Sequence, residues 1–443
     1  MSHPSVFSLP LELLEEIADE VHLDTQLSLC RVSKLFHSLT IRSVYRVIFL
    51  DSPALVVACC RTLASNRTAA LSVRQLAITY TPMEPPRFYY FSSFYALIGK
   101  ALQNLSQLHE LKLMVSDPAY IRTLNRAHFP FLRHFECYLA LTDSLILFLN
   151  RHPTINYLQI APTEAFVQTS VVDSSRPPLQ VVLPKLQYFI GNSECISALV
   201  PDASLRAAFI FWEAAYSTPQ DTIRSLEHSS GDTINLVSCR RRGWNLDLID
   251  LISISLPNIY VLIITNLLVV DVRPSEAYLN AVKNMLSRFS MLRNLHLHCI
   301  DTWNMNDVKC NMDEDFATVT AWGSACPSLL ECILPHSNGM KWIRIHDLWL
   351  PDPNSEQGME WTWDMLCSNG HPQWNRLLVD IEARLRRKAV YARGVEEAIS
   401  VLRSLTLQSA SGDDVHDREE NDVVDSGRAV GGGGSDPPRS IVL

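Results

Sequence analysis

A short apolar pattern, L-x-x-L-x-L with apolar substitutes, recurs in order from residue 73 to residue 334. Successive copies begin 19 to 37 residues apart. The copies are Val73/Leu76/Ile78, Leu108/Leu111/Leu113, Leu132/Phe135/Cys137, Ile155/Leu158/Ile160, Leu186/Phe189/Gly191, Leu205/Ala208/Ile210, Ile234/Val237/Cys239, Ile259/Leu262/Ile264, Leu292/Leu295/Leu297 and Leu329/Cys332/Leu334. Such a recurrence is typical of proteins in which each unit contributes one strand. The copy that ends at Gly191 is degenerate, because its third position has no apolar side chain.

Helix-like stretches lie between these strands, at 91–105, 142–152 and 276–289. Proline stands two or three residues before five of the strands, in FPFL, HPTI, LPKL, LPNI and CPSL. A proline there ends the preceding helix and biases the residue before it away from helix. Because one strand with its crossover helix cannot bury its apolar face alone, the units are expected to stack into a solenoid with a parallel sheet. An ordinary α/β domain is the alternative.

The chain has 443 residues, which at about 150 residues per domain suggests roughly three domains. A stacked array grows by adding units, so residues 51–407 are expected to form one α/β solenoid. Helices predicted at 374–388 and 392–407 would close it. From Gln408 onward the composition changes to Ser, Gly, Asp and Glu, which predicts a disordered acidic and Gly-rich tail over 408–443.

Composition excludes several classes of protein. The net charge of -9 argues against a nucleic-acid-binding role, which usually needs a basic face. The 11 cysteines form no CxxC pair and the start of the chain does not read as a secretion signal, so we expect reduced thiols and a cytoplasmic and/or nuclear protein.

Residues 251–270 carry no charge and could span a membrane. Ser253, Pro257 and Asn258 interrupt the stretch, however, and the Pro-Asn pair is typical of a turn. A buried strand is therefore the preferred interpretation, and no membrane association is expected.

Catalytic and cofactor motifs are not apparent: the sequence has no phosphate-binding glycine loop, no H-E-x-x-H and no G-x-S-x-G. His296, His298 and Cys299 could be metal ligands, but no fourth ligand has a fitting spacing. The acidic run 313–315 is better explained as a helix start, where carboxylates are favoured. We expect no enzyme activity, no cofactor and no metal.

Residues 6–50 predict three short helices and a first strand. In the first helix, Pro10 suits the first turn, and apolar residues recur from Leu13 to Val21 at helical spacing. Asp24 or Thr25 could cap the second helix, and Ser33 the third. The segment 44–50, VYRVIFL, is rich in β-branched and aromatic residues and predicts the strand.

This N-terminal segment resembles an F-box, and the layout of the whole chain is similar to that of the F-box proteins abundant in mushroom-forming fungi. The matching positions are Leu9-Pro10, Glu12-Leu13-Leu14, Ile17, Leu27 with Leu29, Val32-Ser33-Lys34, Phe36 and Tyr45-Arg46. The link EVHLDTQ departs from the usual Asp-Leu before the second helix. The later units are similar to leucine-rich repeats but lack their regular asparagine, so the array is expected to be irregular.

The resemblance implies that residues 1–50 are an F-box and that the chain is the substrate-recognition subunit of an SCF-type cullin–RING ubiquitin ligase. The F-box would dock on the Skp adaptor, and through it on a cullin, while the repeats would hold an unknown substrate protein. It also implies the adaptor-binding residues, which are Leu9, Pro10, Leu13, Leu14, Ile17, Leu27, Leu29, Val32, Ser33 and Phe36. The alternatives are a non-catalytic interaction scaffold with no ubiquitin role, and a repeat protein whose first helix only caps the array.

Overall fold

The computed structural model describes residues 9–80, 90–160, 180–199, 203–212, 219–230, 233–267, 274–299, 312–335, 340–345 and 348–352, together with 355, 358, 360–362 and 365. The helices expected at 374–388 and 392–407 and the tail from Gln408 lie outside these residues. The chain divides into two compact units, with the boundary between Gly339 and Met340.

Three helices open the first unit: α1 (Leu11–Glu20), α2 (Leu23–Val32) and α3 (Lys34–Val44). Ser33 caps α3, as predicted, because its hydroxyl accepts the Phe36 backbone N–H at 3.2 Å. The predicted cap of α2 is wrong: that helix begins at Leu23, with His22 at the capping position, so Asp24 and Thr25 already lie in its first turn. Pro10 occupies the position immediately before α1.

Eleven parallel strands follow in the first unit, each paired with the next in chain order. They are β1 (Val47–Leu50), β2 (Gln75–Ile78), β3 (Glu110–Leu113), β4 (His134–Cys137), β5 (Tyr157–Ile160), β6 (Tyr188–Asn192), β7 (Ala207–Phe211), β8 (Leu236–Arg242), β9 (Val261–Leu267), β10 (Asn294–Cys299) and β11 (Glu331–Ile333). The predicted α/β class with a parallel sheet is confirmed, and every copy of the apolar pattern lies at a strand.

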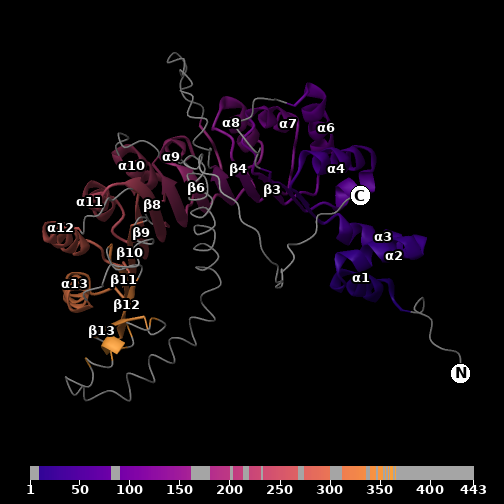
Figure 1. The fold of residues 1–443 in the computed structure, drawn as a ribbon. Helices are drawn as coiled ribbons and strands as arrows, with labels where there is room; N and C mark the ends of the chain where they lie inside the picture. The colour runs from indigo at the N-terminus through magenta and orange to yellow at the C-terminus, as the bar shows by residue number, and fades with distance from the viewer. Residues whose placement is uncertain are drawn as a thin grey trace, which may run out of the picture. The chain divides into compact units, whose positions relative to one another are not determined.

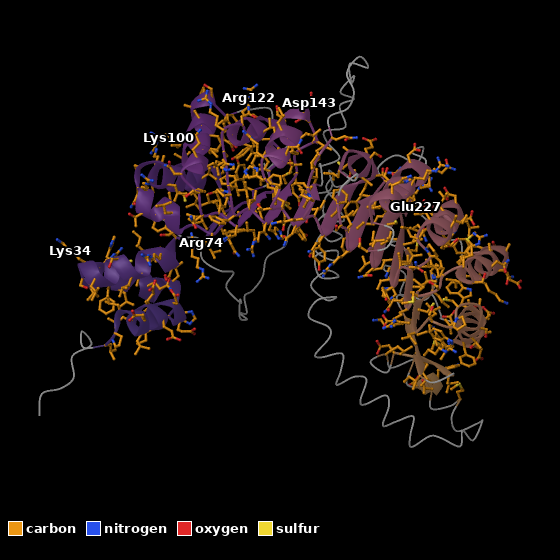
Figure 2. All side chains as sticks on the ribbon, turned by 180° about the vertical axis from the view of Figure 1, so that it is seen from behind. Lys34, Arg74, Lys100, Arg122, Asp143 and Glu227 are labelled. Carbon is orange, nitrogen blue, oxygen red and sulfur yellow. The ribbon has the colours of Figure 1, made fainter. Side chains whose placement is uncertain are left out.

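The helices described between strands lie on one side of the strand row in this unit (Figure 1). They are α4 (Pro53–Ser65), α5 (Arg67–Ser72), α6 (Ser92–Gln103), the 3₁₀ turn η2 (Pro118–Tyr120), α7 (Ile121–Leu124), α8 (Asp143–Asn150), α9 (Ser193–Leu199), α10 (Pro219–Ser230), α11 (Leu246–Ser255), α12 (Glu276–Leu286) and α13 (Met312–Ala325). Lys100, Arg122 and Asp143 project from α6, α7 and α8 on the side away from the strands (Figure 2).

The core lies between the strands and these helices, and the apolar pattern supplies its central layer. Every side chain of the pattern is at most 2% exposed. The second positions of adjacent copies are also register partners, as in Leu111 with Phe135 and Val237 with Leu262. Burying one such side chain contributes about 1.5–3 kcal/mol, so the ladder is the main source of cohesion between units.

The five prolines occupy turns that deliver the chain to the strands. In each turn the residue before proline accepts a backbone hydrogen bond from the first apolar residue of the pattern, as in Leu132 N–H to Phe129 O and Ile155 N–H to His152 O. Proline suits the second position of such a turn because its ring fixes φ near the required value. A second contact recurs next to it: the carbonyl just before one strand accepts two N–H groups of the next unit, as Arg74 O does from His109 and Glu110.

The uncharged stretch 251–270 is divided between a helix and a strand. Its first residues complete α11, and the buried strand β9 follows after the turn at Pro257 and Asn258. None of the helices among the described residues has the length and apolar character that a membrane span requires.

The second unit contains an antiparallel pair, β12 (Lys341–Ile345) and β13 (Leu348–Pro351). Ile343, Ile345 and Leu350 form its apolar cluster, against which Leu348 and Met365 pack. Trp342 is buried and its ring contacts that of Trp361 edge-on at 5.4 Å.

Candidate partner-binding surfaces

Helix α1 has apolar residues on two adjacent stripes. Leu14 and Ala18, four residues apart, are buried at 2% and 1% exposure. Leu13 and Ile17 follow the same four-residue spacing one position earlier and are 45% and 53% exposed, and Leu9, which precedes the helix, is 39% exposed. Residues four apart lie on one face of a helix, so α1 has a buried face and a separate apolar face on the surface.

The buried stripe packs in a small core formed by the three helices. Gln26 Nε2 donates to the Ala18 carbonyl at 2.9 Å and thereby ties α2 to α1. Thr40, on α3, is completely buried and donates its hydroxyl to the Phe36 carbonyl at 2.7 Å. This core contains few large apolar side chains, because polar Gln26 and Thr40 occupy central positions.

The ten residues implied as adaptor-binding fall into three groups. Exposed are Leu9, Pro10, Leu13, Ile17 and Val32; half-buried are Leu27, Leu29, Ser33 and Phe36; buried is Leu14. Sequence reasoning missed Leu11, which is 53% exposed on α1. The signal was available in the sequence, since Leu11 is apolar and lies directly after Pro10.

Only Tyr45 and Arg46 separate α3 from β1. Tyr45 is buried, and burial together with the nearby thiols of Cys59 and Cys30 raises its pKa. The carbonyl of Arg46, just before β1, accepts the N–H groups of Arg74 and Gln75, so the chain is hydrogen-bonded to the sheet two residues after α3 ends.

The strands have a second face, on the side opposite the helices, which we call the helix-free face. Successive residues of a strand alternate between faces, so the residues between pattern positions belong to it. On β3 to β5 these residues are polar: Glu110, Lys112, His134, Glu136, Tyr157 and Gln159. On β6 and β7 they are mainly apolar, and they include Ile190 and Phe209.

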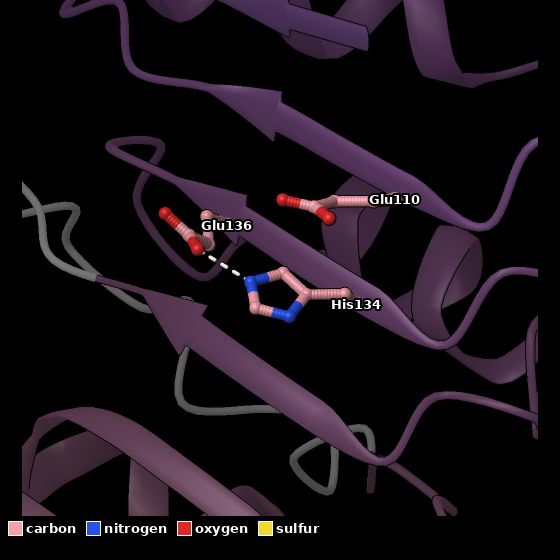
Figure 3. A group of neighbouring side chains, drawn as sticks. All are labelled: Glu110, His134 and Glu136. Atoms are coloured by element: carbon pink, nitrogen blue, oxygen red, sulfur yellow. Dashed lines mark hydrogen bonds and ion pairs between the residues drawn. The ribbon is translucent and has the colours of Figure 1, made fainter. Parts of the chain in front are cut away.

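Glu110, His134 and Glu136 form a cluster on this face of β3 and β4 (Figure 3). One ligand atom of each residue lies within 4.8 Å of the others, a geometry that could hold a cation. The ammonium group of Lys112 already occupies the place of a cation: its Nζ lies 3.0 Å from Glu110 Oε1 and 3.1 Å from Glu136 Oε1. A metal ion would have to displace this ammonium group, so we interpret the cluster as an internal ion-pair network.

Electrostatics within the cluster agree with that interpretation. Burial raises the pKa of Glu136, but the hydrogen bond with His134 and the charge of Lys112 outweigh burial and lower this pKa below its ordinary value. The His134 ring stacks on Tyr157 with centroids 3.9 Å apart. Sequence analysis did not identify this cluster, because its members come from two units whose register is set by the sheet.

The LHLHC segment lies on β10. His296 is buried on the helix-free face, and its Nε2 lies 3.0 Å from Glu331 Oε1 on β11. His298 lies on the same face, with the two rings 5.8 Å apart, whereas Cys299 is on the core side. The three candidate ligands therefore do not share one face.

The described cysteines are all free thiols, as the sequence predicts. Burial raises the pKa of Cys59 to about 11 and that of Cys60 and Cys137 to about 12. The reactive form of cysteine is the thiolate, so these thiols are unreactive near neutral pH.

A comparison with protein-family models finds no match to this chain, and a comparison with curated proteins finds no significant relative.

Proposed function

We propose that the chain is the substrate-recognition subunit of an SCF-type cullin–RING ubiquitin ligase. In this proposal α1 to α3 act as an F-box that docks on the Skp adaptor, and through it on a cullin. The strand–helix units act as an irregular leucine-rich-repeat solenoid that holds a substrate protein. The chain makes no bond itself: it raises the effective concentration of a substrate lysine near the charged ubiquitin-conjugating enzyme.

The exposed pair Leu13 and Ile17 on α1, with exposed Leu9 just before the helix, is the observation that carries the proposal. Completing the burial of a half-exposed Leu or Ile contributes about 1 kcal/mol, half of the value for a fully exposed side chain. A stripe of this kind on an otherwise acidic helix suits an apolar partner surface. Leu11 is also exposed, but at 100° per residue it lies on a different side of the first turn from Leu13 and Ile17.

The direct connection between α3 and β1 adds support. Two residues and a pair of backbone hydrogen bonds leave little freedom between the helices and the first strand. A receptor of this class needs that property, because the substrate must be held at a defined position relative to the adaptor.

The capping interpretation predicts a different surface. A terminal unit that only protects the end of a repeat array presents polar side chains to solvent. One side of α1 instead exposes Leu13 and Ile17, which favours docking over capping. An interaction scaffold would bind the adaptor without directing ubiquitination. It differs from a receptor only in that the protein it binds is not ubiquitinated.

Co-purification with the Skp adaptor tests the docking step. Replacing Leu13 with Asp, or Leu9 and Pro10 together with Ala, should abolish co-purification while the thermal melt of the chain stays nearly unchanged. Leu147→Asp is the matched control, because Leu147 is a 56% exposed leucine on the helix α8. Failure of the wild-type chain to retain the adaptor would refute the proposal.

A second measurement separates receptor from scaffold. Proteins captured by the wild-type chain in cells should have longer half-lives when the Leu13→Asp variant replaces it. Unchanged half-lives, with adaptor binding intact in the wild type, would indicate the scaffold.

A further inference from the structure

Strand β8 carries three arginines in succession, and they divide between its faces. Val237 and Cys239 are completely buried on the core side. Alternation therefore places Arg240 and Arg242 on the helix-free face and Arg241 on the helix side. Arg241 has a partner there: its Nη1 lies 2.8 Å from Asp247 Oδ2 at the start of α11.

Arg240 is half-buried, and its Cζ lies over the ring of its register partner Phe211, 5.5 Å from the ring centroid. Thr265 is its register partner on β9. Among the residues that the structure describes, no acidic side chain forms an ion pair with Arg240 or Arg242. Burial lowers the pKa of Arg240, and no neighbouring charge contributes to the shift.

The partly desolvated charge of Arg240 lacks a counter-ion among the described residues, and this lowers the stability of the folded state. Arg241 next to it is paired. The ring of Phe211 offsets part of this cost through its contact with the guanidinium. A guanidinium is planar and has five N–H donors, two of which can donate in parallel to the two oxygens of a carboxylate. An incoming carboxylate would therefore find a fixed guanidinium that is paired with no acidic side chain among the described residues.

We propose that Arg240 and Arg242 bind the acidic side chains of an extended segment of a partner protein, lying along the helix-free face. Alternate residues of a strand lie on one face about 6.6–6.8 Å apart, and an extended peptide has the same repeat, so two carboxylates separated by one residue match the two arginines. The net charge of -9 disfavours a nucleic acid as the occupant. The inference rests on the proposed function, in which this face holds the substrate.

Fluorescence anisotropy with the full-length chain tests the site. The probe is a labelled ten-residue peptide of alternating Glu and Ser, compared with alternating Lys and Ser and with a ten-nucleotide oligothymidylate. The Glu peptide should bind, and Arg240→Gln and Arg242→Gln should each weaken its affinity about tenfold or more. Arg293→Gln is the matched control, because Arg293 Cζ stacks over Tyr260 at 5.3 Å on another part of the sheet, and it should bind like the wild type.

Several outcomes would overturn the inference. They are failure of the wild-type chain to bind the Glu peptide, tighter binding of the oligothymidylate, or an equal loss in Arg293→Gln. A thermal melt of each variant excludes unfolding as the cause; Arg242 is exposed, so its replacement leaves the fold intact. Peptide binding needs no adaptor, so the two proposals can fail separately. A chain that binds the peptide but not the adaptor refutes only the proposed function. A chain that binds the adaptor but not the peptide refutes only this inference.

Discussion

Leu13 and Leu14 are consecutive residues of α1 with opposite surroundings: Leu13 is 45% exposed and Leu14 only 2%. A helix turns by 100° per residue, so neighbours in sequence face different directions. Leu14 belongs to the core of the three helices, whereas Leu13 belongs to the surface stripe.

Leu14→Ala should destabilise the three-helix segment by about 2–5 kcal/mol, because truncation leaves a cavity in a small core. Leu13→Ala should change stability by about 0.5 kcal/mol or less. Hydrogen exchange of residues 11–44 in the two variants measures the difference. Equal effects would mean that the two faces of α1 are assigned wrongly.

Leu262 is completely buried at the centre of β9, between its register partners Val237 and Leu295. Leu262→Ala should cost about 2–5 kcal/mol of unfolding free energy, measured by urea denaturation. Ile254→Ala is the control, since Ile254 on α11 is 61% exposed. A neutral Leu262→Ala would show that the register of the sheet is wrong.

Gly191 stands where other copies of the pattern have an apolar side chain. A Cβ at this position would lie 2.7 Å from the Ile160 carbonyl oxygen and 2.7 Å from the Phe189 ring. The Phe189 ring therefore occupies space that a side chain at position 191 would need. Gly191→Ala should lower stability by about 1–3 kcal/mol through overpacking. A smaller companion residue relieves the contact with the ring but not that with the Ile160 carbonyl, so Gly191→Ala with Phe189→Leu should melt above the single variant yet below the wild type.

His152 links two units, and it should make stability depend on pH. The Phe129 N–H donates to His152 Nε2 at 2.9 Å, and Nδ1–H donates to the Phe148 carbonyl at 2.7 Å. Burial lowers its pKa to about 4. In the unfolded chain His152 is protonated below its ordinary pKa of 6.5, whereas in the folded chain it is protonated only near pH 4. The contribution of neutral His152 to stability is therefore complete above pH 6.5 and declines as the pH falls to about 4.

The loss should reach roughly 3 kcal/mol across that range. Urea unfolding of the wild type and of His152→Gln over the same pH range measures it. The difference in unfolding free energy between the two chains should shrink toward acid pH. A difference that is constant with pH would contradict a neutral His152 in the folded state.

Sequence alone located the eleven parallel strands of the first unit, the residues of the core ladder and the cap at Ser33, but not β12 and β13. These features depend on short-range causes: the two-residue alternation of a strand, the turn chemistry of proline and the hydrogen bond from a serine to a helix N-terminus. Local signals also predicted the turn at Pro257 and Asn258 and the buried strand β9 after it, but not that residues 251–255 belong to the helix α11.

Tertiary structure alone decided which side chains meet across units. Lys112 reaches Glu136, and Arg240 lies over Phe211, because the sheet places those residues in register. These residues hold matching positions of their pattern copies, but copies that begin 19 to 37 residues apart do not show which strands pair, and only the sheet decides that each pairs with the next. The division of α1 into a buried and an exposed apolar stripe has the same origin: both stripes are apolar in sequence, and only the packing of α2 and α3 determines which one is covered.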